Sequence, residues 1–317
     1  MSRLTRARYL TLDLFNNYFL FRVSRILLAE RTRFQTLELV ESPEFGLCLV
    51  LDGLIQVAEY DEYRYHETLV HTPLLNAENR RRIAILGGGD GCALREVLKY
   101  RDVEQVDLVD IDRRVVEVSE KYLQRLNKGS LKSRRVRIHY TDARKFISRK
   151  KNYYDSIVID LTDPVEGGPS VLLYSIEFYR MVHNALKPGG SFITQATAFQ
   201  SSQFRRIFWT VRRVFGTSVP LHVYVKSFCD DWGFVMGLKP WEGLRLSPED
   251  FKEVDKRIGE KVRGRLRYLN GKTYLANFSM SPEEEEALMK PVKEITDREA
   301  LRSLVEEKEA NPNWIFR

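Results

Sequence analysis

Short apolar runs alternate with segments of helical spacing from residue 82 onward. The apolar runs cover residues 83–86, 106–109, 136–138 and 156–159, and the helical segments lie near 91–100, 112–126 and 174–186. Continuous apolar strands separated by helices are typical of a parallel sheet covered by helices on both faces. The pattern therefore predicts an α/β fold in which residues 78–245 form a Rossmann-like domain with a mostly parallel, doubly wound sheet.

The two ends of the chain follow other patterns. Residues 33–59 read as strands, with an Asp52-Gly53 pair suited to a tight hairpin turn, and residues 61–75 begin with two acids and continue at helical spacing. We therefore expect residues 1–77 to form a β-hairpin domain with a linking helix. Residues 202–214, 219–225 and 232–238 are expected to finish the large sheet. The charged segment 246–317 predicts a helical extension packed on the α/β domain.

Composition excludes several classes of protein. In 317 residues, 43% are apolar and 30% charged, which is typical of a globular protein, and no apolar stretch approaches the length of a membrane span. Cys48, Cys92 and Cys229 lie far apart, so the sequence predicts neither a zinc site nor a disulfide framework. The net charge of +7 is scattered in short clusters. We expect a cytoplasmic protein that binds neither nucleic acid nor membrane.

Glycines and acids at predicted strand ends indicate a nucleoside site. The first apolar strand runs into a loop containing Gly87, Gly89 and Asp90, and the next strand ends at Asp110 about 20 residues further on, where an acid can bind ribose hydroxyls. The third strand is followed by Asp142 and Ala143, the usual place for a carboxylate that binds an adenine amino group. The spacing G-x-G-x-G favours an S-adenosyl ligand over a dinucleotide.

The charge of Asp90 bears on which S-adenosyl compound binds. S-adenosylmethionine would place a carboxylate near this loop, and an aspartate there would repel it. Decarboxylated S-adenosylmethionine ends in an ammonium, which Asp90 would attract. The sequence therefore favours aminopropyl transfer over methyl transfer, although an aspartate that pointed outward as a helix cap would remove this argument.

Two further acids suit the chemistry of such a transfer. Asp160 and Asp163 follow the fourth apolar strand and are expected to face the same crevice. An alkylammonium with a pKa near 10 must lose its proton before its nitrogen can attack the carbon next to a sulfonium. We expect Asp160 to accept that proton and Asp163 to hold the amine chain, with Tyr65 and His66 either orienting the nitrogen or packing on a helix face.

Five segments together resemble the spermidine synthase family. They are DGLIQVAEYDEYRYHE (52–67), ILGGGDG (85–91), DID (110–112), DAR (142–144) and DLTDPVEGGP (160–169). The resemblance covers nearly the whole chain and implies a small N-terminal β-domain followed by a methyltransferase-like Rossmann catalytic domain. It implies decarboxylated S-adenosylmethionine as a co-substrate, no metal, no permanently bound cofactor, and a homodimer or homotetramer.

The resemblance also assigns roles to individual residues. Contacts with the methylthioadenosine part are implied for Gln35, Asp110, Asp142, Ala143 and Pro169. Contacts with the amine groups are implied for His66, Asp90 and the Asp160–Asp163 loop, and Gln56 and Tyr65 are implied to line the amine pocket.

Two departures from common spermidine synthases resemble thermospermine synthase, which extends spermidine. The loop DPVEGGP (163–169) is longer, and SFCDDWG (227–233) replaces a tyrosine-containing segment. Glu166, Asp230 and Asp231 are candidates for binding the additional ammonium of spermidine. Putrescine, agmatine or spermine as acceptor, a small-amine methyltransferase and a catalytically silent polyamine-binding protein remain as alternatives.

Overall fold

The computed structural model describes residues 8–14, 17–164, 169–240 and 242–302, so Glu166 lies outside the described residues. A seven-stranded sheet dominates this part of the chain, in the order β12-β13-β11-β10-β7-β8-β9. The strands are β7 (Arg82–Gly87), β8 (Gln105–Asp110), β9 (Val136–Tyr140), β10 (Tyr154–Asp160), β11 (Leu186–Ala198), β12 (Val219–Val225) and β13 (Asp230–Lys239). Strands β7 to β11 pair in parallel, and β12 and β13 are added antiparallel.

Helices cover both faces of this sheet. The helices that follow the parallel strands or cover the sheet are α1 (Glu62–Asn76), α2 (Cys92–Val97), α3 (Arg113–Tyr122), α4 (Gln124–Asn127), α5 (Ala143–Ile147), α6 (Ile176–Ala185) and α7 (Ser202–Phe215). Alternate residues of β7 enter different cores: Ala84 and Leu86 pack with α6 and α7, whereas Ile83 and Ile85 pack with α1 and α2. The predicted doubly wound α/β fold is confirmed. Residues 202–214 do not finish the sheet as expected, because they form α7, whose apolar face packs on it.

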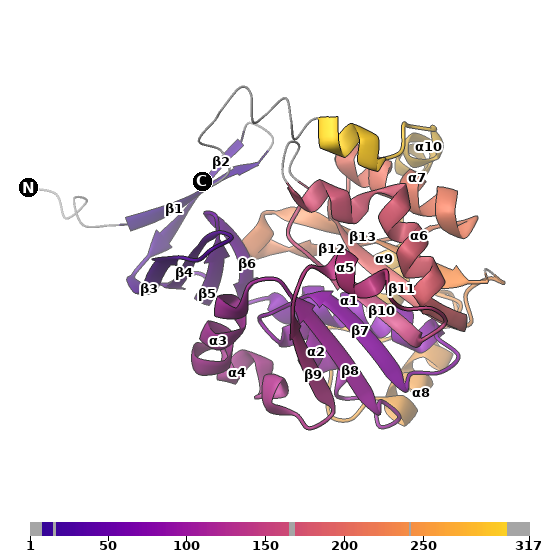
Figure 1. The fold of residues 1–317 in the computed structure, drawn as a ribbon, viewed down its shortest axis with the longest axis horizontal. Helices are drawn as coiled ribbons and strands as arrows, with labels where there is room; N and C mark the ends of the chain where they lie inside the picture. Colours follow the sequence, from indigo (N-terminus) through magenta and orange to yellow (C-terminus); the bar gives the residue numbers. More distant parts are fainter. Residues whose placement is uncertain (1–7, 15–16, 165–168, 241, 303–317) are drawn as a thin grey trace, which may run out of the picture.

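Antiparallel strands form a smaller unit at one side of the large sheet (Figure 1). Strands β3 (Arg25–Arg31), β4 (Thr36–Ser42), β5 (Gly46–Leu51) and β6 (Leu54–Ala58) make one sheet, and β1 (Arg8–Leu14) pairs with β2 (Asn17–Val23). Asp52 and Gly53 form the two-residue turn between β5 and β6, with φ values of 47° and 81°. Positive φ at both positions is what such a hairpin turn requires, so the predicted hairpin is confirmed.

The charged C-terminal segment is anchored to α1. It contains α8 (Phe251–Lys261), α9 (Gly271–Phe278) and α10 (Pro282–Met289). The buried carboxylate of Glu67 on α1 accepts hydrogen bonds from the backbone N–H groups of Arg267, Tyr268 and Leu269 at 2.7–2.8 Å. The predicted domain boundaries at 77/78 and 245/246 stay a prediction. Residues of α1 and of the C-terminal segment share a hydrophobic core with the large sheet, so the packing does not mark a boundary at these positions. In the described part of the chain, no helix has both the length and the apolar character needed to cross a membrane.

Candidate active site

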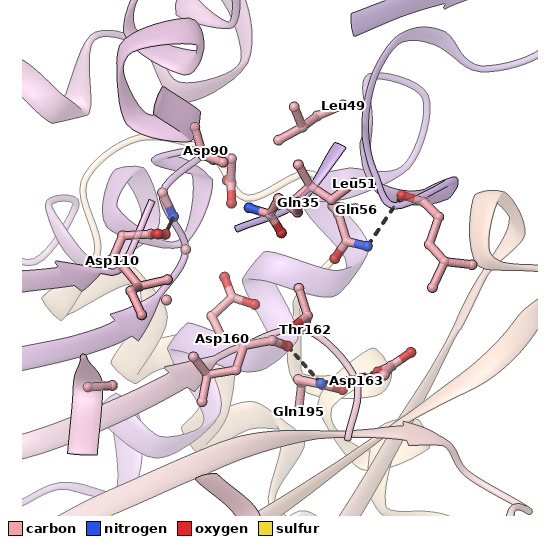
Figure 2. Close-up of a pocket in the computed structure, with 18 of the residues that line it drawn as sticks. Gln35, Leu49, Leu51, Gln56, Asp90, Asp110, Asp160, Thr162, Asp163 and Gln195 are labelled. Atoms are coloured by element: carbon pink, nitrogen blue, oxygen red, sulfur yellow. Dashed lines mark hydrogen bonds between the residues drawn. The ribbon is translucent and has the colours of Figure 1, made fainter. Parts of the chain in front are cut away.

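A pocket lies where the carboxyl ends of the parallel strands meet the small β-sheet. Twelve residues predicted from the sequence line it: Gln35, Gln56, Tyr65, His66, Gly87, Gly89, Asp90, Asp110, Asp142, Ala143, Asp160 and Asp163. Figure 2 shows the carboxylates of Asp90 and Asp160 and the amide of Gln35 reaching into the same space. Strand order explains this convergence, because β10, β7 and β8 are neighbours in the sheet and their carboxyl ends form one edge.

The glycine loop allows a close approach at one end of the pocket. Gly87 has a φ of +84°, and a Cβ atom there would lie 2.0 Å from the carbonyl oxygen of Asp160. A Cβ atom on Gly89 would lie 2.5 Å from Oδ2 of Asp110, which already accepts a hydrogen bond from the Gly89 N–H group at 3.0 Å. Both positions therefore require glycine.

The nucleoside end of the pocket is built around Asp110 at the tip of β8. Burial raises the pKa of Asp110 to about 6. Gln35 reaches this end from the small sheet, and its amide donates to Asp112 at 3.1 Å. Asp142 lines the pocket beside Ala143 and also caps α5 by accepting from the Lys145 N–H group at 2.8 Å.

Asp90 lines the pocket and also accepts a hydrogen bond from the first residue of α2. Its Oδ1 atom accepts a hydrogen bond from the Cys92 N–H group at 2.7 Å, and the same atom lies 3.7 Å from Nε2 of His66. Only 11% of the side chain is exposed. This hydrogen bond therefore does not turn the aspartate outward, and its carboxylate lines the pocket.

His66 stands in an acidic surrounding on α1. Its Nδ1 atom lies 2.7 Å from the backbone oxygen and 3.0 Å from Oε2 of Glu62, and its Nε2 atom lies 4.0 Å from Oδ2 of Asp160. Burial opposes a charge on the ring, but the hydrogen bond to Glu62 and the charges of Asp90 and Asp160 raise the pKa of His66 to about 9. The histidine is therefore a cation at neutral pH.

Asp160 is the last residue of β10, and only one of its two carboxylate oxygens accepts a hydrogen bond from a described residue. The Tyr65 hydroxyl donates to Oδ1 at 2.7 Å, whereas the buried Oδ2 atom has no hydrogen-bond partner among the described residues. Burial raises the pKa of Asp160 to about 6, against the charge of His66. An unpaired buried carboxylate oxygen is costly unless a ligand supplies the missing donor.

Asp163 occupies the next position along the pocket. Burial raises its pKa to about 6, and its Oδ1 atom accepts a hydrogen bond from Nε2 of Gln195 at 3.2 Å. The same amide donates to the Tyr174 hydroxyl at 2.6 Å and to the Leu161 backbone oxygen at 2.8 Å. Gln195 was not predicted from the sequence. Its only signal is an amide side chain near the carboxyl end of β11, among small and apolar residues.

Aromatic residues that were also not predicted close the acidic end of the pocket. Phe228 and Trp232 line it, with ring centroids 4.8 Å apart, and the Phe228 ring also lies 5.7 Å from that of Tyr65. The indole N–H group of Trp232 is buried without a partner in the described part of the chain. A cation can lie against these ring faces.

Four predicted residues are not placed in the pocket wall. Asp231 is absent from the lining residues, and its carboxylate lies 2.7 Å from Nδ1 of His222 on β12. Asp230 is also absent from the lining, and its Oδ1 atom accepts from the Asp231 N–H group at 2.7 Å. Of Pro169 only the backbone, at the start of the 3-10 helix η3 (Pro169–Tyr174), is described, and Glu166 lies outside the described residues.

Comparison with known proteins identifies the family. A model described as the spermine/spermidine synthase domain matches residues 62–240, and one described as the spermidine synthase tetramerisation domain matches residues 15–59. The chain is 37% identical over 282 residues to a polyamine aminopropyltransferase of Saccharolobus solfataricus, covering 88% of this chain and 92% of that protein. It is 40% identical over 256 residues to polyamine aminopropyltransferase 2 of Hyperthermus butylicus, covering 80% and 82%.

Solved structures show the same relationship. Spermidine synthase from Thermotoga maritima superposes with a TM-score of 0.78 at 26% identity, covering 91% of this chain and 96% of that one. A spermidine synthase in complex with the transition-state analogue AdoDATO gives a TM-score of 0.79 with the same identity and coverage. The chain therefore belongs to the spermine/spermidine synthase family, and it is an aminopropyltransferase.

Proposed function

We propose that this chain transfers the aminopropyl group of decarboxylated S-adenosylmethionine to spermidine, giving thermospermine and methylthioadenosine. The observation that carries the proposal is the buried Oδ2 atom of Asp160, which no described residue partners, in a pocket that has a nucleoside end and an acidic end. At the nucleoside end, we assign Gln35, Gly87, Gly89, Asp110, Asp142 and Ala143 to the methylthioadenosine part of the donor.

The acidic end supports a donor without a carboxylate. Asp90, Asp160 and Asp163 all line this end, and His66 alone does not balance them. A methionine carboxylate in this space would meet like charges in a poorly screened environment, whereas an ammonium would be attracted. The carboxylates of Asp90 and Asp160 each have an oxygen within 4.8 Å of a His66 ring nitrogen and of one another. The one charge of His66 does not balance both carboxylates, and we propose that the ammonium of the substrate supplies the missing positive charge.

The reaction is a direct displacement. The acceptor nitrogen forms a bond to the aminopropyl carbon next to the sulfonium, the carbon–sulfur bond breaks, and its electron pair leaves with neutral methylthioadenosine. The acceptor nitrogen must lose a proton to attack, and we assign that proton to the free Oδ2 atom of Asp160. Tyr65 holds the other carboxylate oxygen, which keeps Oδ2 aimed into the pocket. The raised pKa of Asp160 makes it a better proton acceptor than an exposed aspartate.

The remaining polar groups suit positioning of the acceptor chain. We assign Asp163 to a second ammonium, since Gln195 holds its carboxylate at the pocket wall. Gln56 lines the same region and completes the amine pocket. The aromatic rings of Phe228 and Trp232 suit the alkyl segments and a further cation of a triamine. Spermidine as acceptor is further supported by the segments that resemble thermospermine synthase.

The small β-sheets suit an oligomer interface. The matched family model for residues 15–59 is named for tetramerisation, and we propose a homodimer or homotetramer on that basis. Light scattering after size-exclusion chromatography tests this, and a monomer at micromolar concentration would contradict it.

Product analysis tests the proposed function. The protein is incubated with decarboxylated S-adenosylmethionine and, separately, spermidine, putrescine, agmatine and spermine, and products are separated chromatographically before mass spectrometry to distinguish thermospermine from spermine. Thermospermine should form fastest. Preference for putrescine would move the acceptor assignment, and turnover with S-adenosylmethionine but not its decarboxylated form would establish a methyltransferase. No turnover with any acceptor would favour a silent polyamine-binding protein.

A further inference from the structure

A second cavity of about 710 Å³ has a lining that shares no residue with that of the pocket. Segments distant in the sequence form it: the end of β6, helices α1, α2 and α4, and the stretch between α8 and α9. We call it the basic groove. Its lining residues are Glu59, Glu62, Glu67, Arg95, Glu96, Leu98, Lys99, Arg125, Leu126, Asn127, Lys128, Ser130, Arg263, Arg265 and Arg267.

The acids of the basic groove are already engaged. Both oxygens of Glu62 face the guanidinium of Arg95 at 2.8 and 2.9 Å. Glu96 pairs with Arg95 and Lys99, each at 2.6 Å. Glu59 pairs with Arg125, and the Glu67 carboxylate accepts the three backbone N–H groups named above. The groove therefore has no acid left to balance further cations.

Four cations of the groove lack such a partner. Lys128, Arg263, Arg265 and Arg267 are exposed, and none forms an ion pair with any residue that the structure describes. With seven basic and four acidic side chains, the lining has an excess of three positive charges. The three arginines are alternate residues of a non-helical stretch, and all three reach the groove from it. Positive charges that line one cavity repel one another, and an anion bound among them would remove that repulsion.

We propose that the basic groove binds an oligophosphate, either inorganic or the triphosphate of a nucleotide. Arginine guanidinium groups match the geometry of phosphate oxygens and hold them with paired hydrogen bonds. Several cations on one concave surface favour an anion with several charges over a single carboxylate. Leu98, which is only partly buried, adds an apolar surface to the lining, on which the base of a nucleotide can pack.

Three contacts link the basic groove to the catalytic pocket. The Asn127 amide donates to the Asp90 backbone oxygen at 3.0 Å, and the Ser130 hydroxyl donates to the Gly91 backbone oxygen at 2.7 Å. Glu62, held by Arg95 in the groove, faces His66 in the pocket at 3.0 Å. An anion that shifts these groups changes the position or charge of the glycine loop and His66. Binding in the groove is therefore coupled to binding in the pocket, and the coupling is reciprocal.

Calorimetric titration with inorganic tripolyphosphate tests the proposal without any substrate of the enzyme, so its failure is separate from a failure of the proposed function. We expect saturable binding that the double variant Arg263→Gln/Arg265→Gln weakens by about tenfold, since each exposed charge contact accounts for a severalfold change. Arg149→Gln/Lys151→Gln removes two exposed cations outside the groove and should bind as the unchanged protein does. Absent binding would overturn the proposal. Equal weakening in both variants would also overturn it, because nonspecific charge attraction would then explain the binding.

A second probe identifies the source of the phosphates. If cytidine triphosphate binds more tightly than tripolyphosphate and this gain in affinity is lost in Leu98→Ala, the groove is assigned to a nucleotide. Equal affinities for the two compounds would assign it to inorganic oligophosphate. The coupling is measured as the change in methylthioadenosine affinity at saturating tripolyphosphate. We expect a change of severalfold in the unchanged protein and none in Arg263→Gln/Arg265→Gln. An affinity that tripolyphosphate leaves unchanged would overturn the coupling.

Discussion

Replacing His66 with glutamine tests the electrostatic balance of the pocket. The unchanged ring is a buried cation between Glu62, Asp90 and Asp160, and its pKa rises from 6.5 to about 9 on folding. Glutamine keeps a hydrogen-bonding group of similar length, but its amide carries no charge and does not titrate. The variant therefore removes the titration while leaving a polar side chain in place.

The size of the effect follows from the pKa shift. The rise in the pKa of His66 from 6.5 to about 9 corresponds to about 3 kcal/mol of folding free energy. Because the pKa is raised in the folded state, this stabilisation is fully present below pH 6.5 and is lost as the pH rises through 9. The pKa values of Asp160 and Asp163 are raised to about 6. The folded state therefore loses stability through these two groups as the pH rises from 3.8 to about 6, which is below the window of His66.

Urea unfolding at fixed protein concentration measures the effect, since an oligomer's stability depends on concentration. Between pH 6.5 and 9, we expect the unchanged protein to lose about 3 kcal/mol more of unfolding free energy than His66→Gln loses. His183→Gln is the control: burial lowers the pKa of that histidine, so the loss in this window should persist. Because the charge of His66 also opposes the rise in the pKa of Asp160, the two side chains at position 66 are compared in the Asp160→Asn background as well, and parallel curves there would refute a cationic His66.

Three other substitutions test the remaining parts of the site and fold. Asp160→Asn should lower kcat by roughly 10²–10⁴-fold, as expected for loss of a proton acceptor, while methylthioadenosine affinity in calorimetry stays within about threefold; retained turnover would remove Asp160 from its assigned role. Gly89→Ala should weaken methylthioadenosine binding at least about tenfold, because the new Cβ atom would lie 2.5 Å from the Asp110 carboxylate. Gly259→Ala is its control, since that helical position has nothing within 4 Å, and equal affinities would contradict the close approach. Glu67→Gln should destabilise the protein by about 1–3 kcal/mol, because one backbone donor or more loses its charged acceptor; an unchanged urea midpoint would show that the C-terminal segment is held in another way.

Local features of the sequence were enough for the fold class and for the glycines and acids of the pocket. Apolar runs of strand length between helical segments predicted the parallel sheet, because burial on both faces imposes that pattern on each strand separately. Asp52-Gly53 predicted the hairpin, since few other residues accept positive φ at both turn positions. Glycines and acids at strand ends predicted Gly89, Asp110 and Asp160, because the ends of neighbouring parallel strands always share one edge.

Only the tertiary structure decided the partners of these side chains. Tyr65 donates a hydrogen bond to Asp160, which is 95 residues away in the sequence. The sequence alone was equally compatible with a tyrosine that packs on a helix face. Gln195 and Trp232 enter the pocket, while Asp231 turns to His222, although all three lie in or beside β11 and β13. Sequence patterns report which face of an element is apolar. Side-chain partners across the pocket depend on the packing distance and rotation between elements, to which residues throughout the core contribute.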